Sequence, residues 1–576
     1  MRVLRHRSPR SRLIQLVGVA LLLSAAACTK ATPGELGPVA IAVDAAANRH
    51  AINPYIYGIN FGTTAMLQDL RVPLNRSGGN SASAYNWRLD ARNAGRDWYY
   101  ESLPVNPADI NDQFGDRFVA LTQAAGATPI ITISMLGRVA TLSRARERLA
   151  SFSIAKYGLQ QNYDVDGLAD AGNGILRDGT QVVNDPNDAT VPDDPASQQA
   201  RVAALVQQFG PARSGGVRYY AMDNEPSLWQ LIHNDVHPIG PHASEIAAKV
   251  IAYSRAVKAA DPGAQVLAPE EWGWNGYQYS GFDQQHSIKH GYAQAPDRAR
   301  ETGGMAYVPW LLTQWKKAGR PVDIFSLHFY PQSGEYEEAA NGNSQKIALM
   351  RNRSTRNLWD TNYKDPTWIN SVVALIPMMR QWVDTYYYPG TPIAITEYNW
   401  GADTRMNGAT AQADVLGIFG REKLDMATRW GTLDPAMPVY KAIKLYRNYD
   451  GHGGAFGSTS VAATVPDPDT VSAFAALRDT DGAMTVVVIN KQLDSAAKAN
   501  VSLANFTGAG SGEVWQLVNN ELTRGPDVTY SGNTLQVELP PQSIKLLVLR
   551  GTAQPPLPPA AAGAKPAAKS AVKPVN

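Results

Sequence analysis

Two short stretches place glutamates where they could carry out chemistry. In the first, the β-type run 217–221 leads to Asn224 and Glu225, and the proline that follows predicts that the strand stops at Glu225. In the second, the apolar run 392–396 ends at Glu397, and aromatic and amide residues follow it. Two carboxylates that flank a scissile bond are the usual machinery of glycoside hydrolysis. The pair therefore indicates cleavage of a glycosidic bond.

The two glutamates would have different roles. Glu225 is our candidate general acid/base, so its pKa must lie near the working pH. Glu397 is our candidate nucleophile, which must be ionised, and Asn224 could hydrogen-bond a sugar hydroxyl near the reacting carbon. If both carboxylates lie at the mouth of one barrel, they should be about 5 Å apart and the reaction should retain configuration. A salt-bridged loop residue is the alternative for either glutamate alone.

Further polar and aromatic residues follow predicted strands or lie in predicted loops. Arg76, His328 and Tyr330 could each orient a glutamate or hydrogen-bond the substrate, and Arg76 would help to keep a nearby carboxylate ionised. The alternative for Arg76 and His328 is a buried structural role. Tryptophans stack on sugar rings but also fill cores. The candidate sugar platforms are Trp98, Trp272, Trp274, Trp359 and Trp400.

Composition limits the class of protein. A chain of 576 residues predicts a large domain with a smaller one. Its 44% hydrophobic and 18% charged residues are typical of a globular protein, and the net charge of +2 gives no general attraction to nucleic acid. The 13 Trp and 25 Tyr favour sugar binding, given the two glutamates.

The first residues predict export from the cell. A basic leader precedes the apolar run Leu13–Ala27, so we expect residues 1–27 to be a signal peptide, too short to span a membrane comfortably. The single cysteine, Cys28, excludes intramolecular disulfides and follows an alanine cluster, which indicates a lipoprotein cleavage site with lipid on Cys28. Ordinary cleavage at the alanines is the alternative. Residues 28–37 would be a tether, and the protein would be secreted or lipid-anchored at the cell envelope.

Strand-like runs alternate with helical segments through residues 51–464. This alternation predicts an α/β fold, a closed (β/α)₈ TIM-like barrel, with an open parallel sheet as the alternative. The last predicted strand is the weakest. The eight predicted strands are 55–61, 72–80, 128–134, 217–221, 265–269, 322–330, 392–396 and 453–457.

The pattern changes after the barrel. Short strands split by Gly, Asp and Asn turns predict a C-terminal antiparallel β-sandwich over residues 465–550. A short β-run within 38–50 could add an N-terminal strand to it. Residues 551–576 are rich in Pro, Ala and Lys, so we expect a disordered tail.

An acidic loop at residues 164–194 has no clear secondary structure. Its carboxylates would suit calcium, but the spacing is not that of an EF-hand, and a solvated acidic loop is the alternative. Phosphate-loop, zinc-helix, dinucleotide and serine-hydrolase patterns are not found in the sequence.

The ordered motifs together resemble glycoside hydrolase family 44, the secreted bacterial endo-β-1,4-glucanases and xyloglucanases. They span most of residues 55–460. The motifs that carry the resemblance are Asn75–Asn80, Tyr85–Trp87, Asp97–Glu101, Asp170–Gly174, Asn184–Asp188, Asp223–Trp229, His233–Pro238, Pro269–Trp274, Leu327–Pro331, Ser354–Asp360 and Ile395–Gly401.

The resemblance implies a barrel packed on a β-sandwich, with Glu225 as acid/base and Glu397 as nucleophile. It also implies retaining, endo-acting cleavage of internal β-1,4-glucosidic bonds in xyloglucan or soluble β-glucans, without a catalytic cofactor. The family's structural calcium maps onto Glu101, Asp185 and Asp188. We expect a monomer whose partner is a β-glucan, with no nucleic acid and with membrane contact only through a lipid anchor.

The sequence leaves three other functions as alternatives. A xylanase or mannanase would use the same glutamates, and loop residues would decide the substrate. A non-catalytic surface glycan-binding lipoprotein should have lost one of the two glutamates, and both are present. A periplasmic solute receptor would need two similar α/β lobes, which the late β-rich segment argues against. Since the sequence shows no separate cellulose-binding module, we expect soluble substrates to be cleaved better than crystalline ones.

Overall fold

The computed structural model describes residues 38–110, 112–336 and 343–554. The predicted signal peptide, Cys28 and the tether 28–37 lie outside these residues, as does the tail from residue 555 onward. None of the helices in the described ranges is long and apolar enough to cross a membrane.

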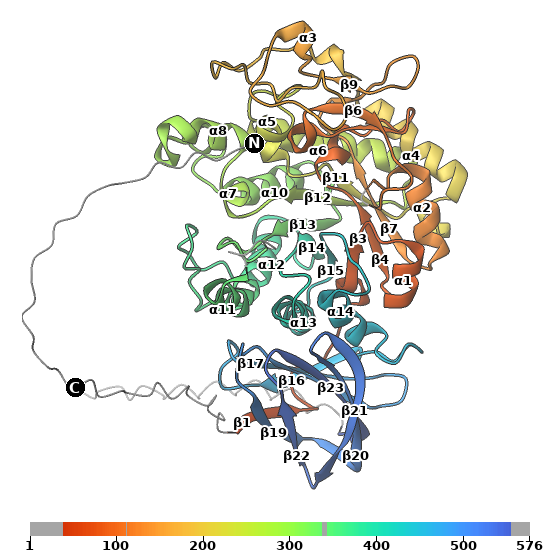
Figure 1. Cartoon of the computed structure of the whole chain (residues 1–576), viewed down its shortest axis with the longest axis vertical. Helices are drawn as coiled ribbons and strands as arrows, with labels where there is room; N and C mark the ends of the chain where they lie inside the picture. Colours follow the sequence, from red (N-terminus) through yellow and green to blue (C-terminus); the bar gives the residue numbers. More distant parts are fainter. Residues whose placement is uncertain (1–37, 111, 337–342, 555–576) are drawn as a thin grey trace, which may run out of the picture.

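Eight parallel strands form a closed barrel, shown in the upper part of Figure 1, which confirms the predicted (β/α)₈ architecture. Around the barrel the strands follow chain order, as expected when each is joined to the next by a helical crossover. The barrel strands are β3 (Gly58–Asn60), β4 (Leu74–Ser77), β7 (Thr128–Ile133), β11 (Tyr219–Met222), β12 (Gln265–Glu271), β13 (Ile324–Phe329), β14 (Ile393–Tyr398) and β15 (Met426–Arg429).

The predicted eighth strand is wrong. β15, which pairs with β14 and β3, closes the barrel, whereas residues 453–457 belong to the connection that leads to the C-terminal sheet. The sequence of β15, Met-Ala-Thr-Arg, has neither an apolar run nor an alternation of apolar and polar residues, so no local pattern predicts this strand. Its neighbours on both sides supply the pairing that makes this short segment a strand.

Helices cover the outside of the barrel strands. Along β7, Ile130 belongs to the small apolar cluster inside the barrel, while Ile131 and Ile133 belong to the larger core beneath the helices. This alternation follows from the pleat of a strand. The helices are α1 (Thr64–Leu70), α2 (Gly115–Ala124), α3 (Ile154–Tyr157), α4 (Pro195–Phe209), α5 (Trp229–Ile232), α6 (Ala243–Ala260), α7 (Trp274–Gln278), α8 (Gly281–His290), α9 (Pro296–Arg300), α10 (Tyr307–Lys317), α11 (Gln345–Ser354), α12 (Leu375–Tyr386), α13 (Met406–Arg421) and α14 (Pro438–Arg447).

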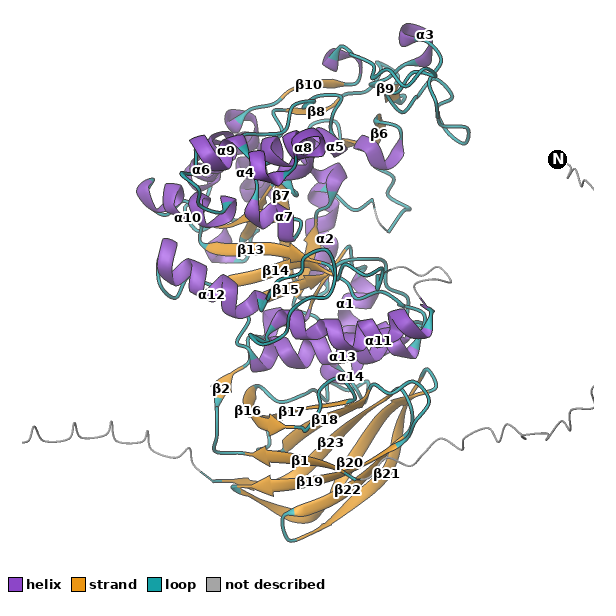
Figure 2. Ribbon diagram, turned by 90° about the vertical axis from the view of Figure 1, so that its left-hand side faces the viewer, coloured by secondary structure: helices purple, strands orange, loops and turns teal. Residues whose placement is uncertain are grey.

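Two small sheets are inserted in the loops that follow β4 and β7. Both are antiparallel and lie in the upper part of Figure 2, with the long segment around α3. One consists of β5 (Ala91–Asn93), β6 (Glu101–Pro104) and β9 (Leu149–Ala150), and the other of β8 (Arg138–Ala140) and β10 (Thr190–Pro192).

The C-terminal domain is a mostly antiparallel sheet of ten strands, most of them blue in Figure 1, with the N-terminal strand β1 in red. β1 pairs in parallel with β19 and antiparallel with β16, so it joins two edges of this sheet. The strands are β1 (Val39–Asp44), β2 (His50–Ala51), β16 (Thr459–Thr464), β17 (Val471–Leu477), β18 (Met484–Asn490), β19 (Ala497–Ala504), β20 (Phe506–Val518), β21 (Glu521–Ser531), β22 (Thr534–Leu539) and β23 (Ser543–Ala553).

Two predicted boundaries of this domain need correction. After the barrel, the first strand of this sheet is β16, which starts at Thr459 and not at the expected 465, because β16 pairs with β1 and β17. Residues 551–553 are strand rather than tail, since the end of β23 pairs with the start of β20 at Phe506.

Helices α13 and α14 lie between the barrel strands and the C-terminal sheet (Figures 1 and 2). Most residues of α13 are buried, and a Cβ at Gly417 would lie 2.1 Å from the ring of Phe474 in β17, so glycine permits the close approach of this strand. A buried ion pair crosses the junction. Lys491 Nζ lies 2.8 Å from Asp414 Oδ2 and donates to the Asn352 carbonyl oxygen at 3.2 Å.

We predict that Lys491→Met destabilises the protein strongly. The side chains of Lys491 and Asp414 are only 1% and 3% exposed. The substitution therefore leaves a buried carboxylate unpaired and should lower the free energy of unfolding by about 3–5 kcal/mol in urea denaturation. Lys498→Met, which removes an exposed partner of Glu538, should cost no more than about 1 kcal/mol. Equal effects of the two substitutions would contradict a structural role for the buried pair.

Candidate active site

The polar residues of the barrel gather at the carboxyl ends of its strands, where this architecture places chemistry. Arg76 lies in β4, Glu270 in β12, His328 in β13 and Glu397 in β14, and Glu225 follows β11. All five side chains belong to one hydrogen-bonded cluster. The structure thus brings together the two glutamates, Arg76 and His328, as the sequence predicted from separate strand ends.

Glu397 is held by two donors. Arg76 Nη1 lies 2.7 Å from Glu397 Oε1, and the Tyr330 hydroxyl donates to Glu397 Oε2 at 2.8 Å. The side chain of Glu397 is 6% exposed and that of Arg76 is fully buried. Charge-assisted hydrogen bonds of this kind fix a carboxylate and stabilise negative charge on it.

Glu225 faces Glu397 from the turn after β11. The strand ends at Met222, earlier than predicted, and Glu225 itself adopts a left-handed backbone with φ of 44°. Its N–H donates to the Glu270 carbonyl oxygen at 3.0 Å, which holds this strained turn in place. A carboxylate oxygen of Glu225 and one of Glu397 lie within 4.8 Å of each other.

The electrostatic setting of Glu225 differs from that of Glu397. Burial raises the pKa of Glu225 and the neighbouring Glu397 raises it further, whereas the hydrogen bond from His328 lowers it. The net result is a raised pKa, and the side chain keeps 15% of its surface exposed. Glu225 is therefore suited to carry a proton while remaining accessible to a ligand.

Glu270 is the centre of the cluster and was not predicted. It accepts from Arg76 Nη2 at 3.3 Å, from the Thr396 hydroxyl at 2.6 Å, and from His328 Nε2 and Ser326. Although burial opposes ionisation, these partners lower the pKa of Glu270 to about 2. A signal was present in the sequence, because Glu270 ends the fifth predicted strand just as the two assigned glutamates end theirs.

A bulge in β12 explains why two adjacent glutamates can both be used. The pairing with β13 shifts between Pro269 and Glu271, and Glu270 has a φ of 59°. While Glu270 reaches the cluster, Glu271 accepts from the Ser227 hydroxyl at 2.5 Å, below the turn that carries Glu225. Burial and the Glu225 charge raise the pKa of Glu271 to about 8, so Glu271 is a second carboxyl group that sequence reasoning missed.

His328 links three carboxylates. Its Nδ1 lies 2.9 Å from Glu225 Oε1 and 3.6 Å from Glu397 Oε2, and its Nε2 lies 3.2 Å from Glu270 Oε2. Burial alone would lower the pKa of His328, but the carboxylates raise it to about 9. His328 is therefore an imidazolium at neutral pH, with both ring nitrogens donating.

The charges of the cluster balance when one carboxylate is protonated. Arg76 and His328 provide two positive charges, against carboxylates at Glu225, Glu270 and Glu397. A buried net negative charge is unfavourable, so the carboxylate with the raised pKa, Glu225, should hold the proton.

Asn224 lies beside the cluster. Its Oδ1 accepts from Arg76 Nη2 at 3.3 Å, and its Nδ2 donates to Asn80 Oδ1 at 3.0 Å. Asp223, which precedes it, is fully buried and accepts from the Asn224 N–H at 2.8 Å and the Trp229 indole at 3.2 Å. The amide of Asn224 is thus oriented on both sides.

The predicted tryptophan platforms have different environments. Trp98 is 44% exposed, and Trp272 and Trp274 are half-buried in the segment after β12. Trp400 is only 2% exposed and donates from Nε1 to Ser354 Oγ at 3.1 Å, so it is a core residue and the prediction of a sugar platform there is wrong. Trp359 lines a pocket next to the C-terminal sheet, whose lining includes neither glutamate.

The predicted calcium ligands are not brought together. In the described parts of the chain, two groups of three acidic or histidine side chains have possible metal-ligand atoms within 4.8 Å of one another. Neither group contains Glu101, Asp185 or Asp188. Asp188 forms an ion pair with Lys156, with 2.5 Å between Asp188 Oδ1 and Lys156 Nζ. Glu101 lies beside Arg148 and Asp164. Glu101 keeps one buried carboxylate oxygen, Oε1, without a hydrogen-bond partner among the described residues, so calcium binding at this set stays a prediction.

Fold and cluster together define a barrel glycoside hydrolase, in which carboxylates from separate strands face each other at the barrel mouth. The family model of glycoside hydrolase family 44 matches residues 91–333. Endoglucanase A of Paenibacillus lautus is 31% identical over 554 residues, which cover 90% of this chain and 73% of that protein. The chain therefore belongs to glycoside hydrolase family 44 and is an endoglucanase-type, endo-acting glycanase.

Solved structures agree with this assignment. CelM2, a bifunctional glucanase-xylanase from a metagenome library, is 52% identical with a TM-score of 0.86, and the match covers 90% of this chain and all of that one. A family 44 xyloglucanase from Paenibacillus polymyxa is 29% identical with a TM-score of 0.71, over 89% of this chain and 100% of that one.

We predict that His328 makes stability fall at alkaline pH. Folding raises its pKa from about 6.5 to about 9, so its contribution is complete below pH about 6.5 and is lost as the pH rises through about 9. The melting temperature of the wild type should therefore decrease more over this window than that of His328→Gln, measured by calorimetry. His452→Gln, at an exposed histidine, should keep the wild-type slope. Equal slopes for wild type and His328→Gln would exclude an imidazolium in the cluster.

Proposed function

We propose that this protein is a retaining endo-β-1,4-glucanase that cleaves xyloglucan or other soluble β-glucans, with Glu225 as general acid/base and Glu397 as nucleophile. The observation that carries the proposal is the unequal environment of two carboxylates whose oxygens lie within 4.8 Å of each other. Retaining glycosidases have carboxyl groups about 5–5.5 Å apart, whereas inverting enzymes need about 6.5–9.5 Å for a water molecule. The short distance supports direct attack by a glutamate.

In the first step, Glu397 attacks the anomeric carbon as the bond to the glycosidic oxygen breaks. The proton of Glu225 passes to that oxygen, so the leaving sugar departs as an alcohol and a glycosyl ester remains on Glu397. Arg76 and Tyr330, which hold Glu397 at 2.7 and 2.8 Å, orient the attacking oxygen.

In the second step, water attacks the anomeric carbon and Glu397 leaves as a carboxylate. Glu225, now ionised, takes the proton from this water and so returns to its starting state. His328 lies 2.9 Å from Glu225 and stabilises the ionised form between the two steps. Glu270 and Glu397 together balance the charges of Arg76 and His328 before the first step, which leaves Glu225 free to carry its proton.

Other β-1,4-linked polymers are the second candidate substrates. The similarity to CelM2, whose name includes both glucanase and xylanase activity, favours some action on xylan. Of the predicted platforms, Trp98, Trp272 and Trp274 are exposed enough for stacking on sugar rings. Secretion and a lipid anchor on Cys28 remain part of the proposal, supported by the position of the chain's single cysteine after an apolar leader.

We predict that Glu225→Gln and Glu397→Gln each lower kcat on β-glucan by at least about 1,000-fold, because each removes a group that reacts in the transition state. The loss of viscosity of carboxymethylcellulose measures endo-cleavage. Glu513→Gln, at a carboxylate of the C-terminal sheet, is the matched control and should retain wild-type activity. Activity that survives either active-site substitution would mean that the roles are assigned to the wrong carboxylate.

The same roles predict the configuration of the product. Proton NMR at early times should show the β-anomer of the new reducing end before mutarotation, as expected for two displacements at one carbon. If the α-anomer appears first, a water molecule attacks directly and Glu397 is not the nucleophile.

We also predict that initial rates are higher on xyloglucan and carboxymethylcellulose than on xylan, mannan or microcrystalline cellulose. Reducing-end assays at equal polymer mass make the comparison, with Glu397→Gln as the blank. A mannan or xylan rate above both glucan rates would replace the substrate assignment without changing the mechanism. Equal rates on microcrystalline and soluble cellulose would contradict the preference for soluble polymers.

A further inference from the structure

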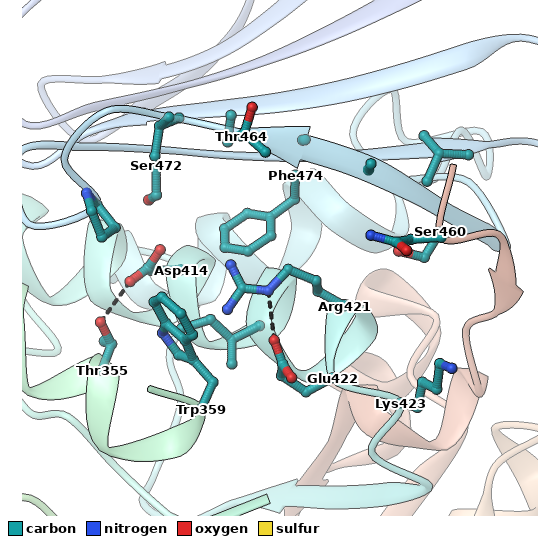
Figure 3. A pocket seen from close by; sticks show the side chains of 18 of the residues that line it. Thr355, Trp359, Asp414, Arg421, Glu422, Lys423, Ser460, Thr464, Ser472 and Phe474 are labelled. Carbon is teal, nitrogen blue, oxygen red and sulfur yellow. Dashed lines mark hydrogen bonds and ion pairs between the residues drawn. The ribbon is translucent and has the colours of Figure 1, made fainter. Parts of the chain in front are cut away.

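A pocket of about 560 Å³ lies between the barrel and the C-terminal sheet (Figure 3). Its walls come from the turn that follows α11, from the end of α13, and from strands β16 and β17. This volume is in the range of small-molecule binding sites. Because neither Glu225 nor Glu397 lines the pocket, it is separate from the hydrolytic centre.

Arg421 is held rigidly in this pocket. Its guanidinium carbon lies 4.3 Å from the ring centre of Trp359 and 5.6 Å from that of Phe474, and Figure 3 shows it between the two rings. Its Nε donates to Glu422 Oε1 at 2.7 Å. Its Nη2 is buried and has no hydrogen-bond acceptor among the residues that the structure describes. A buried charged donor without an acceptor is costly, so this nitrogen is suited to an acceptor from outside the chain.

A second polar atom in the same lining also has no partner. Ser472 of β17 is 4% exposed, and its buried hydroxyl makes no hydrogen bond within the described parts of the chain. In contrast, Thr355 already donates to Asp414 Oδ2 at 2.7 Å, and the Asp414 carboxylate is paired with Lys491. The unused hydrogen-bonding capacity is therefore concentrated at Arg421 and Ser472.

The pocket has an excess of positive charge. Its lining contains Arg49, Arg356, Arg421 and Lys423, against the carboxylates of Asp414 and Glu422. Asp414 is neutralised by Lys491, and Glu422 is the ion-pair partner of Arg421. Arg356 is bound by Asp360, whereas Arg49 and Lys423 form no ion pair with a carboxylate in the part of the chain that the structure describes. A cationic ligand is thus disfavoured and an anionic one is attracted.

We propose that this pocket binds a sugar acid, a pyranose-sized ligand whose carboxylate accepts from Arg421 Nη2 and whose hydroxyl groups bond to Ser472. A guanidinium fixed by stacking presents its free N–H groups to a carboxylate at little entropic cost. The hydroxyl of Ser472 can both donate and accept, which suits a sugar hydroxyl. The chain's glycanase class makes acidic sugars, free or as side groups of an oligosaccharide, the fitting source of such a ligand.

The test is calorimetric titration of the whole protein with D-glucuronate. We expect saturable binding that is weakened at least tenfold by Arg421→Gln and several-fold by Ser472→Ala, which leaves the stacked guanidinium in place. Arg550→Gln is the matched control, because Arg550 is likewise paired with a glutamate but is 65% exposed on the C-terminal sheet. That variant should bind as the wild type does. The β-glucanase activity of Arg421→Gln should be unchanged, so the outcome is independent of the hydrolytic assignment.

Two comparison ligands make the test selective. D-Glucose has the same ring without the carboxylate, and acetate has the carboxylate without the ring, so both should bind at least tenfold more weakly than D-glucuronate. Equal binding of glucose would show a neutral sugar site, and equal binding of acetate would show a simple anion site. Either result would overturn the proposal, as would undiminished binding by a folded Arg421→Gln variant.

Discussion

The active centre depends on the buried ion pairs that Arg76 and His328 make with Glu270. All three side chains are fully buried, and each comes from a different barrel strand. Burying charges costs free energy unless they are paired in good geometry. Here the barrel brings the partners together, and the positive charges left over by Glu270 are directed at Glu225 and Glu397. The charge environment of the two glutamates in the proposed mechanism is thus set by a third carboxylate that is itself fully buried.

Much of the barrel was readable from the sequence because its strands are buried on both faces. Apolar runs such as those that lead to His328 and Glu397 mark such strands, and polar residues at their ends indicate the catalytic face. β15 gave no such signal, since its four residues are a strand only because β14 and β3 pair with them. Local pattern predicts the strands that carry their own apolar surface and fails for those that depend on neighbours.

The candidate site was predicted to a similar extent. Arg76, His328 and Tyr330 contact the two glutamates, but the sequence gave no reason to rank Glu270 above Glu271. Only the bulge in β12 sends one carboxylate to the cluster and the other toward Ser227. The exposure of side chains could not be predicted either, because Trp98 and Trp400 both lie in predicted loops, yet one is at the surface and the other in the core.

The position of β1 has a consequence for the order of folding. Val39 pairs with Ala499. Asp44 accepts a hydrogen bond from Asn505, which lies 461 residues further along the chain. During synthesis from the N-terminus, β1 is made long before β16 and β19, so it cannot pair with them until the barrel residues have also been synthesised. Contacts of such long sequence separation form slowly because closing the loop costs entropy. The C-terminal sheet is therefore completed last, when β1 pairs with β16 and β19 and so joins the N-terminal segment to the C-terminal domain.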